Sequence, residues 1–304
     1  MRIPPIPETL IKSTQGYFRG KGAAWLDTLP GLVAEAADRW HLQLGEASPA
    51  AGTGYVCFAR DGTDRPVVLK IAFPHGEHFT GVEAMRVWGG QGCVRLLDTA
   101  EGGTQVLMDW CLPGTNLHEL EDEEVEVAHA AALMGRLHRP APAEHALPPH
   151  MSWVEKSLRR MAERPVGEAL LPGRLVQALE QTVADLEALR RPVVLHGDLH
   201  HENIVQDGDG WIAIDPKGLT GDPALDIGRY CGNQLHRAEA AGGYGPLVDR
   251  RIELFASALS EPVDRMRAAA AVDIIMCMGW ELEHADFDVE SFTENRDRAL
   301  HLVG

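Results

Sequence analysis

The residues with the clearest chemical potential lie in one segment, VVLHGDLHHENIVQDGDGWIAIDPKG (residues 193–218). An apolar run leads into Asp198, Asn203 follows five residues later, and Asp215 stands at the end of a second apolar run. Carboxylate and amide oxygens are ligands that suit Mg²⁺. The turn sequence Asp-Gly-Asp-Gly at 207–210 predicts a hairpin. We expect this hairpin to fold back and bring the three side chains to one end of the same small sheet.

This set of residues fits the transfer of a phosphoryl group. The reaction needs in-line positioning, metal ions across the phosphates, and one carboxylate that accepts or orients the proton of the acceptor hydroxyl. We assign the carboxylate role, next to the acceptor, to Asp198, and the metal-ligand role to Asn203 and Asp215. The spacing Asp-x-x-x-x-Asn, followed by an Asp at a strand end, matches the catalytic and metal-binding loops of kinases.

The longer string HGDLHHENI…WIAIDPKGLTGDPALDIG resembles the aminoglycoside phosphotransferase family, in its branch of streptomycin 6-phosphotransferases and hydroxyurea phosphotransferases. The resemblance implies a two-lobed, protein-kinase-like α+β fold with a small β-rich N-terminal lobe and a larger helical C-terminal lobe. It implies ATP or GTP as donor, Mg²⁺ as metal, and a cationic, polyhydroxylated acceptor of the streptomycin type. Hydroxyurea or a metabolite is the alternative acceptor. Asp226 matches the family's structural aspartate, which braces the catalytic loop.

The β-rich first third of the chain is expected to bind the nucleotide. Lys70, on the second strand of a predicted hairpin, is where kinases place the lysine that contacts the α and β phosphates. An ordinary solvent-facing lysine is the alternative for this position. Glu83, on a predicted helix, is the expected ion-pair partner of Lys70. Glu77 is the second choice, because it stands near the helix start, where a carboxylate favours the helix dipole.

The other nucleotide contacts are predicted from their position. Ser48 lies in a turn with two glycines, whose backbone N–H groups could meet phosphate. Backbone groups from Asp109 to Cys111 are expected to hydrogen-bond the base, with Met108 behind it. The register of this hinge contact stays open by one residue.

The acceptor site is expected in the second half of the chain. Lys217 stands two residues after Asp215, so it could face the transferred phosphate or be a surface lysine in a loop. Glu281 and Glu283 follow an apolar helix, and we predict that they form a wall of the acceptor pocket.

Two alternatives come from other functional classes. His196, Asp198, His200 and His201 resemble a His/Asp metal cluster, so a metallohydrolase is possible. A zinc hydrolase needs further ligands and one open coordination position, and the remaining histidines supply no second half-site. A binding module with an inactive site is disfavoured, because every group that a kinase needs is present.

The predicted elements divide the chain into two lobes. We place a nucleotide-binding lobe at 1–110, with a leading helix at 22–41, and a helical lobe with the catalytic loop and acceptor site at 111–304. Strands are predicted at 54–60, 66–73, 94–98 and 104–110, and a β segment at 193–215. Helices are predicted at 77–88, 124–138, 173–190, 223–236, 247–259, 263–280 and 291–302.

Composition limits the partners. The formal net charge of −17 disfavours nucleic acid and is compatible with a polycationic small molecule or simply with solubility. The five cysteines lack CxxC spacing, which argues against a disulfide framework and for a reducing compartment. The longest apolar stretch, Ala268 to Trp280, contains Asp273 and is too short to span a bilayer. We therefore expect a cytoplasmic monomer or homodimer.

Overall fold

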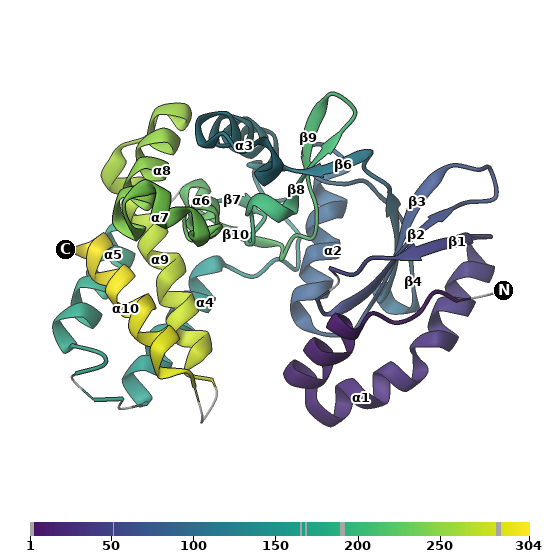
Figure 1. Cartoon of the computed structure of the whole chain (residues 1–304), viewed down its shortest axis with the longest axis horizontal. Helices are drawn as coiled ribbons and strands as arrows, with labels where there is room; N and C mark the ends of the chain where they lie inside the picture. Colours follow the sequence, from purple (N-terminus) through teal and green to yellow (C-terminus); the bar gives the residue numbers. More distant parts are fainter. Residues whose placement is uncertain (1–2, 51, 165, 168, 189–191, 284–286) are drawn as a thin grey trace.

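The fold has a β-rich first part and a helical second part (Figure 1). The computed structural model describes residues 3–50, 52–164, 166–167, 169–188, 192–283 and 287–304. The α+β, two-lobed expectation is confirmed. The last strand of the first part ends at Asp109 and the next strand begins at Pro113, so the expected lobe boundary falls in the connection between them.

The first part is built on one antiparallel sheet. Its elements are α1 (Glu8–Arg39), β1 (Gln43–Ala47), β2 (Gly54–Arg60), β3 (Pro66–Ala72), α2 (Gly76–Trp88), β4 (Leu96–Ala100) and β5 (Gln105–Asp109). The strand order is β1-β2-β3-β5-β4. Lys70 lies in the central strand β3, opposite Val56 and Val106. Strand β1 was not predicted, because its sequence QLGEA is an edge strand without apolar alternation.

Helix α1 begins well before residue 22, its predicted start, and contains Pro30 in its interior. The backbone at Arg19 is non-helical, so the helix is kinked there. An internal proline costs about 3 kcal/mol. The buried side chains Leu29 and Val33 pack with the sheet core, and each such burial contributes about 1.5–3 kcal/mol. Packing against the sheet therefore outweighs the local cost of the proline.

The second part is mainly helical. Its helices are α3 (Glu123–Leu137), α4 (His150–Glu163), α5 (Gly173–Ala188), α6 (Ile227–Cys231), α7 (Ala238–Ala241), α8 (Tyr244–Leu259), α9 (Val263–Glu281) and α10 (Val289–Val303). Its strands are β6 (Pro113–Asn116), β7 (Val193–Leu195), β8 (Ile204–Asp207), β9 (Gly210–Ala213) and β10 (Leu219–Gly221). Short 3₁₀ helices cover Glu101–Gly103, Leu117–Leu120, His201–Asn203, Pro223–Asp226 and Leu235–Arg237.

Most predicted helices of this part match observed ones. The predicted helix 223–236 is instead broken into two 3₁₀ turns around α6. The last two residues of the predicted helix 173–190 lie outside the described residues. The apolar stretch 268–280 forms part of the buried helix α9. Within the part of the chain that the structure describes, no helix is both long and apolar enough to cross a membrane.

The expectation of one small sheet beneath the chemical motif was wrong. The predicted hairpin is present as β8 and β9, which pair with β6 in a three-stranded sheet. Strand β7, which leads into Asp198, pairs instead with β10 in a separate two-stranded sheet. Strand β10 has only three residues, so no strand pattern indicates it in advance.

Helix α2 lies directly on the segment that follows Asp215. A Cβ atom on Gly81 would lie 2.2 Å from the carbonyl oxygen of Pro216. A Cβ atom on Gly218 would lie 2.1 Å from the carbonyl oxygen of Thr80, and Gly218 has a φ of +72°. The Thr80 hydroxyl donates a hydrogen bond to the Lys217 carbonyl at 2.5 Å. Glycine is therefore required on both sides of this contact, which joins the two parts of the molecule.

A substitution at Gly81 tests this contact. Gly81→Ala places a methyl group against the Pro216 carbonyl, and we expect it to lower the free energy of unfolding by about 1–3 kcal/mol, as overpacking does. Gly135→Ala is the matched control, because Gly135 lies in α3 and no other group lies within 4 Å of its Cβ position. The control should be neutral or stabilising by about 0.5–1 kcal/mol. Urea denaturation of both variants measures the difference, and equal stabilities would contradict the close packing.

Candidate active site

The loop that carries Asp198 is braced by one buried carboxylate. Asp226 is 2% exposed and accepts hydrogen bonds from the backbone N–H of His196 at 3.0 Å and of Gly197 at 2.8 Å. The Nε2 atom of His138 lies 3.0 Å from the same carboxylate. Burial would raise the pKa of Asp226, but the contact with His138 and the backbone N–H donors hold it below its usual value. The expected bracing aspartate is therefore in place.

His196 connects the loop to the strand before Asp215. Its Nδ1 atom accepts from the backbone N–H of Asp198 at 3.2 Å, and its Nε2 atom lies 2.9 Å from the carbonyl oxygen of Ile214. The ring is fully buried, and burial lowers the pKa of His196. A neutral ring with the proton on Nε2 satisfies both contacts. His196 is thus a structural residue of the loop.

Asn203 lies directly against the same loop. Its side-chain nitrogen donates to the Asp198 carbonyl at 2.9 Å and lies 3.1 Å from the Nε2 atom of His200. Its backbone carbonyl accepts from the N–H of Ile214 at 2.9 Å, which joins it to the chain just before Asp215. Both side-chain contacts use the amide nitrogen, so the amide oxygen is the atom that can bind a metal ion.

Asp215 has an exposed carboxylate and a positive φ of 55°, a conformation that is uncommon for a residue with a side chain. It forms an ion pair with Lys70 of β3. Desolvation by the surrounding protein would raise the pKa of Asp215, but the charges of Lys70 and Lys217 hold this pKa below its usual value. Asp215 is therefore ionised and able to bind a cation.

The structure does not pair Lys70 with Glu83, so that expected ion pair was wrong. Among the described residues, Glu83 lies 3.6 Å from Arg86 on its own helix.

Glu77, the second choice, pairs instead with Lys217, whose Nζ atom lies 3.0 Å from Glu77 and 3.9 Å from Asp198. Partial burial would lower the pKa of Lys217, but Asp198 and Glu77 raise it above its usual value. Because α2 packs against the segment that follows Asp215, Glu77 lies next to Lys217, and Lys70 lies next to Asp215.

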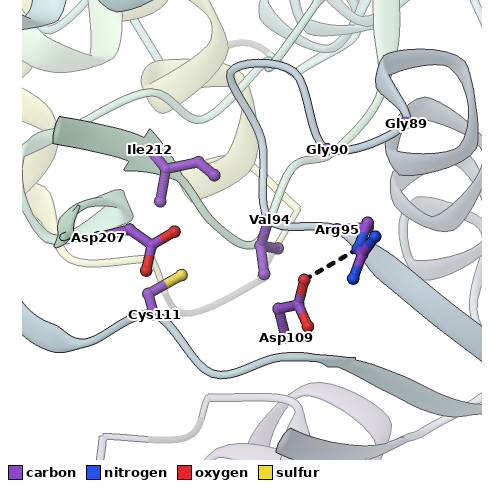
Figure 2. Close-up of a pocket in the computed structure, with 8 residues that line it drawn as sticks. All are labelled: Gly89, Gly90, Val94, Arg95, Asp109, Cys111, Asp207 and Ile212. Atoms are coloured by element: carbon purple, nitrogen blue, oxygen red, sulfur yellow. Dashed lines mark hydrogen bonds and ion pairs between the residues drawn. The ribbon is translucent and has the colours of Figure 1, made fainter.

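The predicted hinge residues lie where the sheet ends. Met108 and Asp109 belong to β5, and Cys111 follows as a buried residue. Asp109 forms ion pairs with Arg65 and with Arg95, the latter at 3.0 Å. Asp109 and Cys111 also line a cavity of about 310 Å³ between the end of α2, the hinge and the β8–β9 hairpin (Figure 2). The predicted phosphate and metal residues are not among those that line it.

Ser48 begins the turn between β1 and β2, and its backbone N–H donates to the Val56 carbonyl at 2.8 Å. Residues of α1 hold this turn from outside. The Thr9 hydroxyl donates to the Pro49 carbonyl at 2.7 Å, and the Ser13 hydroxyl donates to the carbonyl of Gly52. Ala51 lies outside the described residues. The sequence offered no indication that the N-terminal helix would support the predicted phosphate turn.

The two glutamates that we predicted as a wall of the acceptor pocket are already paired within the protein. Glu281 accepts hydrogen bonds from Ser291 and from Asn295 of α10, the latter at 3.1 Å. Glu283 forms an ion pair with Arg160 of α4. A cationic acceptor would have to compete with these partners, so the carboxylates serve first to pack the helices together.

Of the four residues of the metallohydrolase alternative, Asp198 and His200 approach each other at 3.8 Å, but the two other histidines are engaged elsewhere. The ring of His196 contacts backbone groups, and His200 lies 2.8 Å from Glu202.

His201 lies in a buried cluster with Glu123 and Glu126, whose ligand atoms are close enough together to hold a metal ion. Both glutamates of that cluster are paired with arginines, as Glu126 lies 2.6 Å from Arg237 and Glu123 lies 2.6 Å from Arg251. The cluster is therefore already neutralised.

Arg229 also contacts Asp198, although no sequence pattern indicated it. The Nε atom of Arg229, in α6, lies 3.4 Å from the Oδ1 atom of Asp198. Arg229 stands in a stretch predicted as a regular helix, and no sequence spacing links it to the motif. Together the described groups offer a carboxylate for a hydroxyl, oxygen ligands for a metal and two lysines for phosphates. This set suits phosphoryl transfer to an alcohol.

The bracing carboxylate leads to a pH-dependent prediction. Asp226→Asn loses one acceptor for the loop N–H groups, and we expect it to lower the free energy of unfolding by about 1–3 kcal/mol at neutral pH. Because folding lowers the pKa of Asp226, its contribution is complete above the unfolded value of about 3.9 and is lost as the pH falls through the folded value. Urea denaturation from pH 7 downward should show a constant difference that narrows only below about pH 4. A difference that grows on acidification would contradict this role.

Comparison with known proteins agrees with this geometry. Residues 39–281 match the model of the aminoglycoside/hydroxyurea antibiotic resistance kinase family. The chain is 32% identical over 277 residues to a streptomycin 6-kinase of Streptomyces griseus, covering 87% of this chain and 86% of that protein. It is 27% identical to a hydroxyurea phosphotransferase of Kitasatospora aureofaciens, covering 93% and 82%.

The fold is also found in a solved structure. A choline/ethanolamine kinase family protein from Mesorhizobium loti superposes with a TM-score of 0.65 at 14% identity, covering 90% of this chain and 94% of the other. The named relatives are kinases, so the metallohydrolase alternative is not supported. The extent of the family match and the identity to the streptomycin 6-kinase lead to one conclusion: this chain belongs to the aminoglycoside/hydroxyurea antibiotic resistance kinase family.

Proposed function

We propose that this member of the family transfers the γ-phosphate of ATP, with Mg²⁺, to a hydroxyl of a streptomycin-type aminoglycoside. The observation that carries the proposal is the position of Asp198. Its loop is fixed by Asp226, it lies 3.9 Å from Lys217, and its carbonyl is bonded to Asn203. A carboxylate held in this way can accept the proton of an acceptor hydroxyl while the phosphoryl group is transferred.

The groups around Asp215 fit a magnesium–nucleotide complex. Asp215 offers an ionised, exposed carboxylate and Asn203 an amide oxygen, both hard ligands of the kind that Mg²⁺ prefers. These two residues would hold the ion, which when bound neutralises charge on the phosphates. Lys70, now paired with Asp215, would contact phosphate oxygens. The hinge from Asp109 to Cys111 would bind the base, with GTP as the alternative donor.

The streptomycin-type acceptor is supported by similarity and by charge. The match to a streptomycin 6-kinase is closer than the match to a hydroxyurea phosphotransferase, 32% against 27% identity. The net charge of −17 attracts a polycationic acceptor over long range. Hydroxyurea is the second candidate, because the family includes both activities. The five free cysteines support a reducing compartment, and we propose the cytoplasm.

The acceptor assignment is tested by a coupled assay of ADP release with ATP and Mg²⁺. Streptomycin should stimulate ADP release and gain one phosphoryl group by mass spectrometry. Its KM should rise with salt, because screening weakens the attraction between charges. The uncharged hydroxyurea serves as the control, and a KM measured with it should not respond to salt. Phosphorylation of hydroxyurea alone would remove the aminoglycoside assignment and leave the kinase assignment in place.

The role of Asp198 is tested by substitution. Asp198→Asn should lower kcat by roughly 10² to 10⁴-fold, because the hydroxyl proton loses its acceptor. The KM for ATP should stay nearly constant, since the nucleotide contacts lie elsewhere. Asp209→Asn is the matched control, because Asp209 is exposed in the β8–β9 turn, and it should keep the parent's activity. An Asp198→Asn enzyme with a kcat close to that of the parent would refute the assigned role.

A further inference from the structure

Among the described residues with a cationic nitrogen within 4 Å of the Asp198 carboxylate, Arg229 is the one that lies outside the segment 193–218. It lies in the short helix α6, and its side chain is 25% exposed. The Nε atom lies 3.4 Å from Asp198, while the Nη2 atom lies 3.5 Å from the buried Asp273. The guanidinium therefore stands between two carboxylates, one at the site and one in the core.

One face of α9 holds Arg229 in this position. Asp273, Cys277 and Trp280 follow one another at helical spacing and all three contact the guanidinium. Cys277 Sγ lies 3.5 Å from the Nη1 atom, and the ring centroid of Trp280 lies 5.2 Å from the guanidinium carbon. A cation over an indole ring is attracted by the ring quadrupole. Trp280 is itself packed edge-on against Trp153 of α4, so the indole ring lies between Arg229 and a second helix.

The buried carboxylate of Asp273 stabilises the charged guanidinium of Arg229 in this position. Asp273 is 5% exposed, and a buried carboxylate needs a paired charge. The charge of Asp273 raises the pKa of Arg229 above its usual value, so the guanidinium stays positive. Gly228 precedes Arg229, and a Cβ atom there would lie 2.7 Å from the Cβ of Asp273. This close approach brings α6 down onto α9.

The two oxygens of Asp198 face different cations. Oδ1 lies 3.4 Å from Arg229 and 3.8 Å from the Nε2 atom of His200, while Oδ2 lies 3.9 Å from Lys217. Lys217 and His200 lie within the catalytic segment itself. Arg229 is the contact that ties the carboxylate to the helical core.

We propose that Arg229 is a positioning residue for the kinase reaction. Its guanidinium is held by α9 and in turn fixes the orientation of the Asp198 carboxylate. This inference rests on the proposed function. Arg229 acts through Asp198, so its loss should affect turnover with every acceptor and should leave the binding of ATP unchanged. A residue that served only to bind the acceptor would instead alter KM.

The test compares Arg229→Met and Arg229→Lys with the parent, using streptomycin and hydroxyurea as acceptors. Arg229→Met should lower kcat by roughly 10-fold to 100-fold with every acceptor that the parent phosphorylates, the size expected for a misplaced catalytic group. The KM values for ATP and acceptor should stay within about two-fold. Arg229→Lys keeps the positive charge and should recover most of the lost kcat. Arg250→Met is the matched control, because Arg250 is an exposed arginine whose ion pair with Glu124 lies at 3.1 Å, and it should behave like the parent.

Arg229→Met leaves the buried Asp273 without its partner, so its thermal unfolding is measured as well. The double variant Arg229→Met/Asp273→Asn removes both charges and should show the same loss of kcat in a folded protein. An unchanged kcat in the folded variants would overturn the proposal, and so would a loss confined to the KM of streptomycin. A parent that phosphorylates neither acceptor would refute the proposed function itself, which is a distinct result.

Discussion

The site depends on one buried carboxylate that organises the loop around it. Asp226 accepts two consecutive backbone N–H groups, those of His196 and Gly197. A turn with unpaired buried N–H groups would be costly, because each such group loses its bonds to water. The carboxylate removes this cost and fixes the direction in which the next residue, Asp198, leaves the loop. Because Asp226 directly precedes α6, the same residue also connects the loop to the helix that carries Arg229.

A second constraint is the contact between α2 and the segment from Asp215 to Gly218. It leaves no room for side chains at Gly81 and Gly218. The ion pairs of the cleft also differ from the predicted ones, because Lys70 pairs with Asp215 and Lys217 pairs with Glu77. Both pairs join the two parts of the molecule. Helix α2 is thus attached to the segment that follows Asp215 by packing and charge together.

The charge distribution around Asp198 contrasts with that of the whole chain. The net charge is −17, yet Lys217 and Arg229 both approach the Asp198 carboxylate. Overall negative charge favours the approach of a cationic acceptor. The two local cations would attract an anionic phosphoryl group. The net charge of the chain and the charges next to Asp198 therefore have opposite signs, so the local charge cannot be inferred from the net charge.

The sequence by itself determined the chemistry, because the residues that carry it lie close together in the chain. Asp198, Asn203 and Asp215 fall within one segment with a strong turn. The β8–β9 hairpin brings Asn203 next to the residue before Asp215, whereas the strand that leads into Asp198 belongs to a separate sheet. The α+β architecture likewise follows from local patterns of strand and helix. Tertiary structure alone decided the partners of the charged residues. Lys70 and Asp215 are 145 positions apart, and Arg229 reaches Asp198 only because α6 packs on α9. Local periodicity predicts which element a residue belongs to. It cannot predict which distant carboxylate a lysine or arginine meets, because that choice depends on how whole elements pack.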